Sequence, residues 1–191
     1  MSLRWTVVIP VRPGGKTRLL VPGVDRVAIA RAIALDTIEA AAEVADVRVV
    51  TTDASLALPG TVLVLEPAAD GIDGAVRRGL SGVTGPRAVL LGDLPGLLPA
   101  DLAEALALAE AHDRSAVADV EGTGTTLVAA TIGHALVPSF GPDSWRLHLA
   151  SGFTALDVPR DSTLRRDVDL AEHLVGVLGP RTSATLARVD G

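Results

Sequence analysis

Three aspartates, one of them after an apolar segment and two of them paired, are the strongest candidates for binding a divalent cation. Asp93 comes just after the apolar run at residues 88–91, and Asp167 and Asp169 lie two positions apart late in the chain. Two carboxylates with this spacing point the same way when the backbone is extended, and carboxylate oxygens are ligands that Mg²⁺ prefers. The alternative is structural: Asp93 caps the amides of a turn, and Asp169 caps a helix that begins at Leu170.

A loop that combines glycine with positive charge follows the first apolar run, residues 7–11. Gly14 and Gly15 allow backbone amides to approach an anion, and Lys16 and Arg18 supply positive charge. The spacing of the glycines matches neither a Walker A loop nor a dinucleotide-binding fingerprint. The loop therefore predicts a phosphate site of another kind, and the alternative is an ordinary surface turn with two solvated cations.

Three further segments carry groups that suit an anion or a nucleotide. Residues 122–126 (Gly-Thr-Gly-Thr-Thr) and 140–144 (Phe-Gly-Pro-Asp-Ser) combine hydroxyls with glycine amides, and the second opens a predicted helix. A hairpin turn and a capped helix are the alternative reading of these two segments. Residues 70–75 open another helix at Gly71, and either approach a nucleotide or serve only as a glycine-rich helix entry. The four histidines show no metal-binding spacing.

The hydrophobic pattern predicts strands that alternate with helices, and one hairpin between them. This order predicts an α/β fold with a mostly parallel sheet and helices on both faces. Such sheets bind ligands beyond the carboxyl ends of their strands. With no internal repeat and no linker, we expect one domain over residues 1–191. The predicted strands are 7–11, 47–51, 62–65, 88–91 and 153–158, the helices 27–44, 72–80, 99–111, 142–150 and 170–178, and the hairpin strands 116–120 and 126–131.

The composition of the chain excludes several classes of function. A net charge of −6 leaves too little positive charge to neutralise many phosphates, so nucleic-acid binding is not expected. Charges, proline or glycine interrupt every apolar run, which predicts no transmembrane helix and no membrane partner. The first eleven residues lack the features of a signal peptide. The chain has no cysteine, which excludes disulfides and thiolate chemistry and fits a reducing, cytoplasmic location.

Six groups of residues in a fixed order carry a resemblance that covers nearly the whole chain. Together they resemble the guanylyltransferases of deazaflavin coenzyme (F-420) biosynthesis. That family belongs to the Rossmann-like, GT-A-like nucleotidyltransferase fold, which also includes the molybdopterin guanylyltransferases. The most specific segments are 8–11 (Val-Ile-Pro-Val), 16–19 (Lys-Thr-Arg-Leu), 92–95 (Gly-Asp-Leu-Pro), 124–127 (Gly-Thr-Thr-Leu), 140–144 and 164–169 (Leu-Arg-Arg-Asp-Val-Asp).

The resemblance implies both a reaction and a set of site residues. Members of the family couple GTP to phosphoenolpyruvate or to 2-phospho-L-lactate and release pyrophosphate, and we expect phosphoenolpyruvate for this chain. Relatives often carry Gly-Leu-Asn where this chain has Gly71-Ile72-Asp73, which leaves the role of Asp73 open. The implied residues are Asp93, Asp167 and Asp169 for Mg²⁺, Lys16 and Asp93 for catalysis, Thr126, Gly141 and Ser144 for the acid, and Gly14, Gly15, Lys16, Arg18 and Gly71 for the nucleotide.

Two other classes of function stay open at this point. Sugar-nucleotide glycosyltransferases use a related fold, but their Asp-X-Asp pair usually lies in mid-chain, whereas Asp167 and Asp169 come late. A nucleotide-binding module without catalysis would bind GTP and show no Mg²⁺-dependent turnover. For the enzyme, the lack of a Ser–His or Cys–His pair is no objection, because an attacking phosphate oxygen is already ionised at neutral pH. The next enzyme of the coenzyme pathway is an expected partner.

Overall fold

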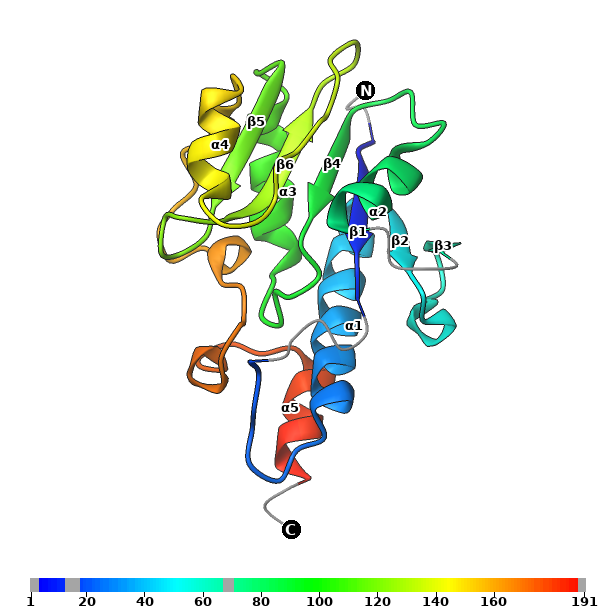
Figure 1. The fold of residues 1–191 in the computed structure, drawn as a ribbon, viewed down its shortest axis with the longest axis vertical. Coiled ribbons are helices and arrows are strands. Elements are labelled where there is room, and N and C mark those ends of the chain that lie inside the picture. The colour runs from blue at the N-terminus through cyan, green and yellow to red at the C-terminus, as the bar shows by residue number, and fades with distance from the viewer. Residues whose placement is uncertain (1–3, 13–17, 67–70, 189–191) are drawn as a thin grey trace.

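A seven-stranded sheet forms the centre of the fold (Figure 1). This computed structural model describes residues 4–12, 18–66 and 71–188. The strand order across the sheet is β3-β2-β1-β4-β6-β5-β7. Within the described ranges, every helix is too short or too polar to span a bilayer. The strands are β1 (Thr6–Pro10), β2 (Asp46–Thr51), β3 (Val62–Leu65), β4 (Arg87–Leu90), β5 (Arg114–Ala118), β6 (Thr125–Ala130) and β7 (Thr154–Ala155).

One strand, β6, is antiparallel to its neighbours. Its amino-terminal end therefore lies at the same edge of the sheet as the carboxyl ends of the parallel strands. The pairs of β1 with β2 and β4, of β2 with β3, and of β5 with β7 are parallel. β6 is antiparallel to both of its neighbours, β4 and β5. The first residues of β6 therefore lie beside the carboxyl end of β4, where the Leu91 N–H donates to the Thr126 carbonyl at 2.9 Å. The mostly parallel sheet and the β5–β6 hairpin are confirmed.

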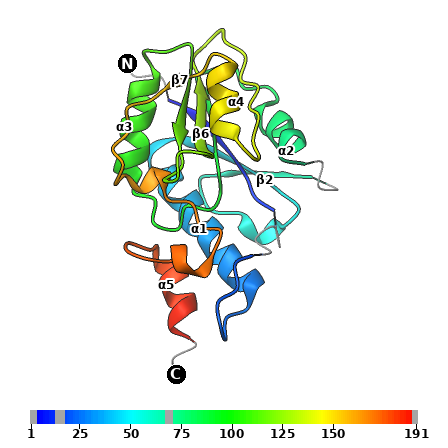
Figure 2. The ribbon, with the colours of Figure 1, turned by 60° about the vertical axis from the view of Figure 1, so that its left-hand side comes forward.

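Helices cover both faces of the sheet (Figure 2). On one face, Ile38 of α1 and Leu102 of α3 pack in the same buried cluster as Ile9 of β1. On the other face, Val76 of α2 packs in a second cluster with Val8 of β1, and α4 adds Trp145 to it. This arrangement confirms the predicted α/β class. The helices are α1 (Arg26–Val44), α2 (Gly71–Leu80), α3 (Pro99–Ala109), α4 (Ser144–Ala150) and α5 (Pro180–Ala187).

The local sequence explains where the central elements form. Val7, Val8 and Ile9 of β1 are all fully buried, because a strand covered by helices on both faces needs a continuous apolar run. α1 begins after Asp25, whose carboxylate accepts the N–H groups of the first turn at 3.3 and 3.2 Å and so satisfies donors that lack a helical partner. α3 begins with Pro99, where the missing amide costs nothing.

Two predicted elements are shorter in the structure. The helix predicted at residues 170–178 is wrong: only a single 3₁₀ turn, Ala171–His173, forms there. Gly176 has a φ of 79°, in the left-handed region that an α-helix cannot continue through. Val175 and Val177 on either side of it are exposed. The strand predicted at residues 153–158 is reduced to β7, Thr154–Ala155.

A buried carboxylate fastens the last helix to the first. Asp36 of α1 is 6% exposed and accepts the backbone N–H groups of Arg181 and Thr182 at 3.1 and 2.8 Å. These donors lie at the start of α5, where amides have no partner inside the helix. A Cβ at Gly179 would lie 2.3 Å from Asp36 Cγ, so the contact also requires glycine at that position.

The Asp36→Ala variant is expected to lose about 3 kcal/mol of unfolding free energy. It removes the acceptor of the buried backbone N–H groups of Arg181 and Thr182 and the carboxylate of a partly buried ion pair with the Arg181 side chain. Urea unfolding followed by circular dichroism measures this loss. Glu39→Ala, which removes the half-exposed second partner of Arg181, is the matched control and should cost less than about 1 kcal/mol. Equal losses in the two variants would contradict the role assigned to Asp36.

Candidate active site

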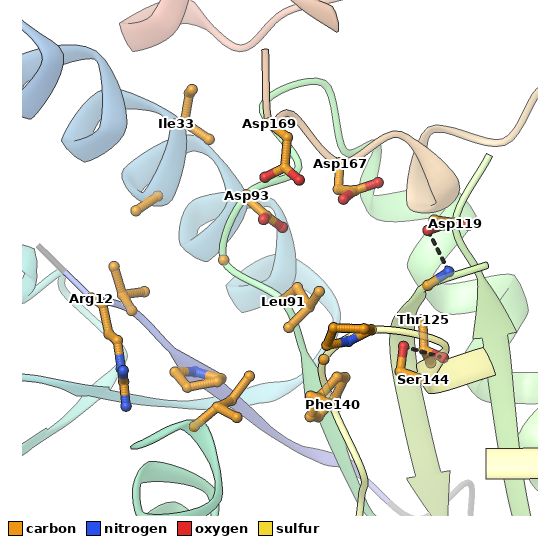
Figure 3. A pocket seen from close by; sticks show the side chains of 18 of the residues that line it. Arg12, Ile33, Leu91, Asp93, Asp119, Thr125, Phe140, Ser144, Asp167 and Asp169 are labelled. Carbon is orange, nitrogen blue, oxygen red and sulfur yellow. Dashed lines mark hydrogen bonds between the residues drawn. The ribbon is translucent and has the colours of Figure 1, made fainter. Parts of the chain in front are cut away.

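A cavity of about 720 Å³ opens where the carboxyl ends of β1 and β4 meet the first residues of β6 (Figure 3). This is the edge at which α/β sheets bind ligands. The polar and charged side chains among the described residues that line it come from six different segments. They are Arg12, Arg18, Asp93, Asp119, Thr123, Thr125, Asp143, Ser144, Asp167 and Asp169.

The turn that carries Asp93 is anchored to α1 through a threonine. The Leu94 N–H donates to Thr37 Oγ1 at 3.1 Å, and the Thr37 hydroxyl donates to the Ile33 carbonyl at 3.0 Å. Thr37 is fully buried, so both hydrogen bonds lie away from solvent. This anchor fixes the backbone next to Asp93, whose side chain lines the cavity.

The turn at Asp93 is also joined to the segment that carries the other two predicted ligands. The Val168 N–H donates to the Asp93 carbonyl at 3.0 Å. The Val168 side chain is buried, while Asp167 and Asp169 on either side of it line the cavity. Asp169 forms an ion pair with Arg18, with Nη2 and Oδ2 3.0 Å apart. The structure thus brings Asp93, Asp167 and Asp169 together around one cavity (Figure 3), with Arg18 paired to Asp169.

A second acidic group overlaps the first, and two of its members, Asp119 and Glu121, are not among the ligands predicted from the sequence. Among the described residues, carboxylate oxygens of Asp119, Glu121 and Asp167 lie within 4.8 Å of one another. However, Asp119 already accepts the backbone N–H groups of Thr123 and Gly124 at 3.0 and 2.6 Å, and Glu121 is exposed. A Cβ at Gly124 would lie 2.2 Å from Asp119 Oδ2. Asp119 therefore closes the β5–β6 turn, and Asp167 is common to both acidic groups.

Arg165 binds backbone carbonyls. Its Nη2 donates to the Asp119 carbonyl at 2.9 Å, and its Nη1 donates to the Val158 carbonyl at 3.4 Å. These bonds fasten the segment that leads to Asp167 onto the end of β5. The structure thus gives Arg165 a role in positioning the acidic segment.

An extra residue in β6 decides which threonine faces the cavity. Val117 of β5 pairs with Leu127, but Ala118 pairs with Thr125, so one additional residue of β6 is accommodated between them. Irregularities of this kind re-aim side chains and are common beside active sites. Thr125 lines the cavity. Thr126, which the resemblance implied for the acid, is absent from the lining among the described residues, although both threonines are buried.

Thr125 is part of a small network of buried polar groups. Its Oγ1 lies 3.3 Å from Ser144 Oγ and 3.0 Å from His148 Nδ1. Ser144 and Gly141, the other two residues implied for the acid, both line the cavity. Gly141 has a φ of 126°, a conformation that disfavours any side chain. His148 could not be singled out from sequence, because its contact with Thr125 forms only in the folded chain.

The predicted nucleotide-binding residues are only partly covered by the structure. Gly14, Gly15 and Lys16 lie outside the described residues. Gly71 begins α2 with a φ of 78°, and a Cβ there would lie 3.7 Å from Arg12 Nη2. Arg12 lines the cavity, and the α2 residue in the lining is Ile72.

The buried imidazole of His148 predicts a pH dependence of stability. Burial lowers the pKa of His148 below its ordinary value of 6.5, and a hydrogen bond with the Ser144 backbone opposes this only in part. The unfolded chain therefore takes up a proton that the folded chain resists, so stability falls as the pH drops below about 6.5. We expect a loss of at most about 1.4 kcal/mol per pH unit from this group. Urea unfolding at pH 7.5 and 5.5 measures it, and a His148→Asn variant with an unchanged slope would contradict it.

The fold defines the class of protein. A nucleotidyl transferase from Methanothermobacter thermautotrophicus superposes with a TM-score of 0.63 at 17% identity, over 89% of this chain and 94% of that one. A Mycobacterium tuberculosis protein solved as a complex with manganese superposes with a TM-score of 0.57 at 17% identity, over the whole of both chains. The chain therefore has the nucleotidyltransferase fold.

Relatives with higher identity narrow the class to one family, although no family model matches the chain. The phosphoenolpyruvate guanylyltransferase of Streptomyces scabiei is 39% identical, in an alignment that covers 98% of each chain. That of Thermomonospora curvata is 41% identical, in an alignment that covers 98% of this chain and 91% of the relative. The chain belongs to the family of phosphoenolpyruvate guanylyltransferases.

Proposed function

We propose that this chain transfers GMP from GTP to phosphoenolpyruvate and releases pyrophosphate. The observation that carries the proposal is one cavity in which Asp93, Asp167 and Asp169 lie across from the hydroxyls of Thr125 and Ser144. Membership of the family supports the choice of both substrates. The chain would do this as a single nucleotidyltransferase domain over residues 1–191.

The chemistry requires little of the protein beyond position and charge. A phosphate oxygen of phosphoenolpyruvate forms a bond to the α-phosphorus of GTP, and the bond from that phosphorus to the oxygen bridging to the β-phosphorus breaks. No proton has to be removed from the attacking oxygen at neutral pH. The cationic side chains of Arg12 and Arg18 in the lining reduce the repulsion between the two anions. Holding both substrates in one cavity supplies the alignment that a displacement at phosphorus needs.

The acid would lie against the β6 side of the cavity. Thr125 and Ser144 offer hydroxyls there, and Gly141 leaves room for a ligand, since no atom outside its own chain neighbours lies within 4 Å of a Cβ built at that position. A carboxylate and a phosphate are acceptor-only groups, so both match hydroxyl donors. We assign Thr125, rather than its neighbour Thr126, to this contact because only Thr125 is in the described lining.

The three aspartates would hold the divalent cation. Carboxylate oxygens on separate segments suit a hard ion such as Mg²⁺, whose preferred ligands are oxygens. The structural relative solved with manganese supports a divalent metal in this fold. When bound, the cation would neutralise charge on the phosphates. The expectation that Lys16 and the glycines beside it contact the nucleotide phosphates stays a prediction, since they lie outside the described residues.

The test is pyrophosphate release by the purified chain. GTP with phosphoenolpyruvate and Mg²⁺ should give turnover, whereas ATP or CTP should give little, and excess EDTA should abolish it. 2-Phospho-L-lactate is assayed in parallel, because it differs from phosphoenolpyruvate only at the C2–C3 unit. Turnover with 2-phospho-L-lactate alone would show that this acid, and not phosphoenolpyruvate, is the substrate. Release of no pyrophosphate with either acid would overturn the proposal.

The proposal also includes the cellular location of the reaction and the pathway to which it belongs. We place it in the cytoplasm, within deazaflavin coenzyme biosynthesis, as the resemblance of the sequence motifs implies. The product would be consumed by the next enzyme of that pathway, so a pull-down of this chain with that enzyme is a direct test of the expected partnership.

A further inference from the structure

We propose that His148 is a positioning residue that fixes the direction of the hydrogen bonds made by the hydroxyls of Thr125 and Ser144. As a result, this pair of hydroxyls offers a hydrogen-bond donor to the acid. The identity of the acid rests on the proposed function. His148 is fully buried on α4 and is absent from the lining among the described residues. Phe140 and Phe153 meet its ring in edge-to-face contacts, with centroids 5.5 and 5.2 Å away. The ring therefore acts on a ligand only through its neighbours.

A backbone amide sets the tautomer of the ring. The Ser139 N–H donates to His148 Nε2 at 2.9 Å. A nitrogen that accepts a hydrogen bond carries a lone pair, so the proton of the neutral ring sits on Nδ1. A backbone N–H has no other role to adopt than that of a donor. The tautomer is thus fixed by the main chain rather than by a second titratable group.

The fixed tautomer determines how the two hydroxyls are used. His148 Nδ1–H donates to Thr125 Oγ1 at 3.0 Å, and Thr125 and Ser144 share a hydrogen bond of 3.3 Å between their oxygens. The two hydroxyls carry one hydrogen each. One of these hydrogens is used between them, and the other is left. Because both side chains line the cavity, the remaining O–H is available to a ligand there.

The opposite tautomer would remove this donor. Nδ1 would then accept the Thr125 hydroxyl, and the Thr125 oxygen would accept the Ser144 hydroxyl. Both hydrogens would be consumed inside the protein, and oxygen lone pairs would face the cavity. A carboxylate or phosphate also presents lone pairs, so the contact would become repulsive. The role of His148 is to keep the pair in the donating arrangement.

Two amide variants separate the two functions of the ring. Asparagine at position 148 places its amide near the position of Nδ1 and keeps a donor for Thr125. Glutamine at position 148 reaches the position of Nε2 and keeps an acceptor for Ser139. We expect His148→Gln to raise the KM for phosphoenolpyruvate roughly tenfold or more, and His148→Asn to raise it much less. The KM for GTP should stay unchanged in both variants.

The outcomes distinguish this role from a merely structural one. If His148 had only a structural role, its replacement would change the KM of both substrates. Alternatively, the KM for phosphoenolpyruvate would rise in the two variants in proportion to their losses in unfolding free energy. Equal increases in the KM for phosphoenolpyruvate would overturn the proposal. If the wild type shows no turnover, the proposed function fails, and the tautomer is then judged separately by spectroscopy.

Nitrogen-15 NMR of the histidine-labelled chain tests the tautomer without any change at residue 148. A protonated Nδ1 and an unprotonated Nε2 have well-separated chemical shifts, and the signal that persists when His112, His134 and His173 are replaced by asparagine identifies His148 among the four histidines. The expected result is a neutral ring with its proton on Nδ1 at pH 7.5. A proton on Nε2, or a doubly protonated ring, would overturn the proposal even if both variants fail to fold.

Discussion

The Asp93→Asn variant is expected to fold like the wild type and to lose turnover by about a hundredfold to a thousandfold. Asparagine has the shape of aspartate but lacks the charge that a divalent cation requires. The contacts of the turn with Val168 and Thr37 use main-chain atoms of residues 93 and 94, so they should persist. Pyrophosphate release at saturating GTP and Mg²⁺ measures the loss, and urea unfolding checks the fold.

Glu121→Gln is the matched control for this prediction. It makes the same change of charge in the acidic group that Asp119, Glu121 and Asp167 form, on a side chain that is exposed. It should leave kcat unchanged. If Glu121→Gln were as damaging as Asp93→Asn, the cation would bind beside the β5–β6 turn rather than at the predicted aspartates.

Replacement of Thr125 by valine is expected to raise the KM for phosphoenolpyruvate roughly tenfold to a hundredfold, because a hydrogen bond to a charged group is lost. Valine has nearly the shape of threonine, so the change removes the hydroxyl without opening a cavity. The KM for GTP should change little. Initial rates over a range of each substrate give both constants.

The same substitution one residue later is the control. Thr126 Oγ1 is buried and has no hydrogen-bond partner among the described residues, so Thr126→Val exchanges an unsatisfied oxygen for a methyl group. It should leave both KM values unchanged and should keep or raise the unfolding free energy. A tenfold increase in the KM for the acid in Thr126→Val, with none in Thr125→Val, would restore the assignment that the sequence motif suggested.

The parts of the fold that depend on continuous hydrophobic patterns were predictable. β1 and β4 are buried runs that pattern alone identifies, and the glycine-rich stretch at residues 121–124 indicated the β5–β6 hairpin. The 3₁₀ turn at Ala171–His173 was not predictable as such, since residues 170–178 have a helical composition. The predicted helix could not continue through the left-handed Gly176, and a glycine in the sequence does not by itself reveal its φ.

Site residues that lie near the ends of strands could be predicted from the sequence. Site residues whose orientation depends on the pairing register of β6 with β5 could not. Asp93 lies in the turn three residues after the end of β4, so topology placed it at the edge where ligands bind. Thr125 and Thr126 cannot be distinguished by sequence, because the extra residue in β6 appears only when the strand is paired with β5. His148 could not be found at all, because its contacts with Ser139 and Thr125 require tertiary structure.

The reversed direction of β6 divides the cavity between two halves of the chain. Arg12, Arg18 and Ile72 come from the amino-terminal half, whereas Thr125 and Ser144 come from the hairpin and α4 beyond it. On the proposed assignment of Thr125 and Ser144 to the acid, selectivity for the acid would evolve by changes in the later half of the chain while Arg12, Arg18 and Ile72 stay unchanged. For laboratory evolution toward other phosphorylated acids, the library belongs at residues 123–126 and 139–148.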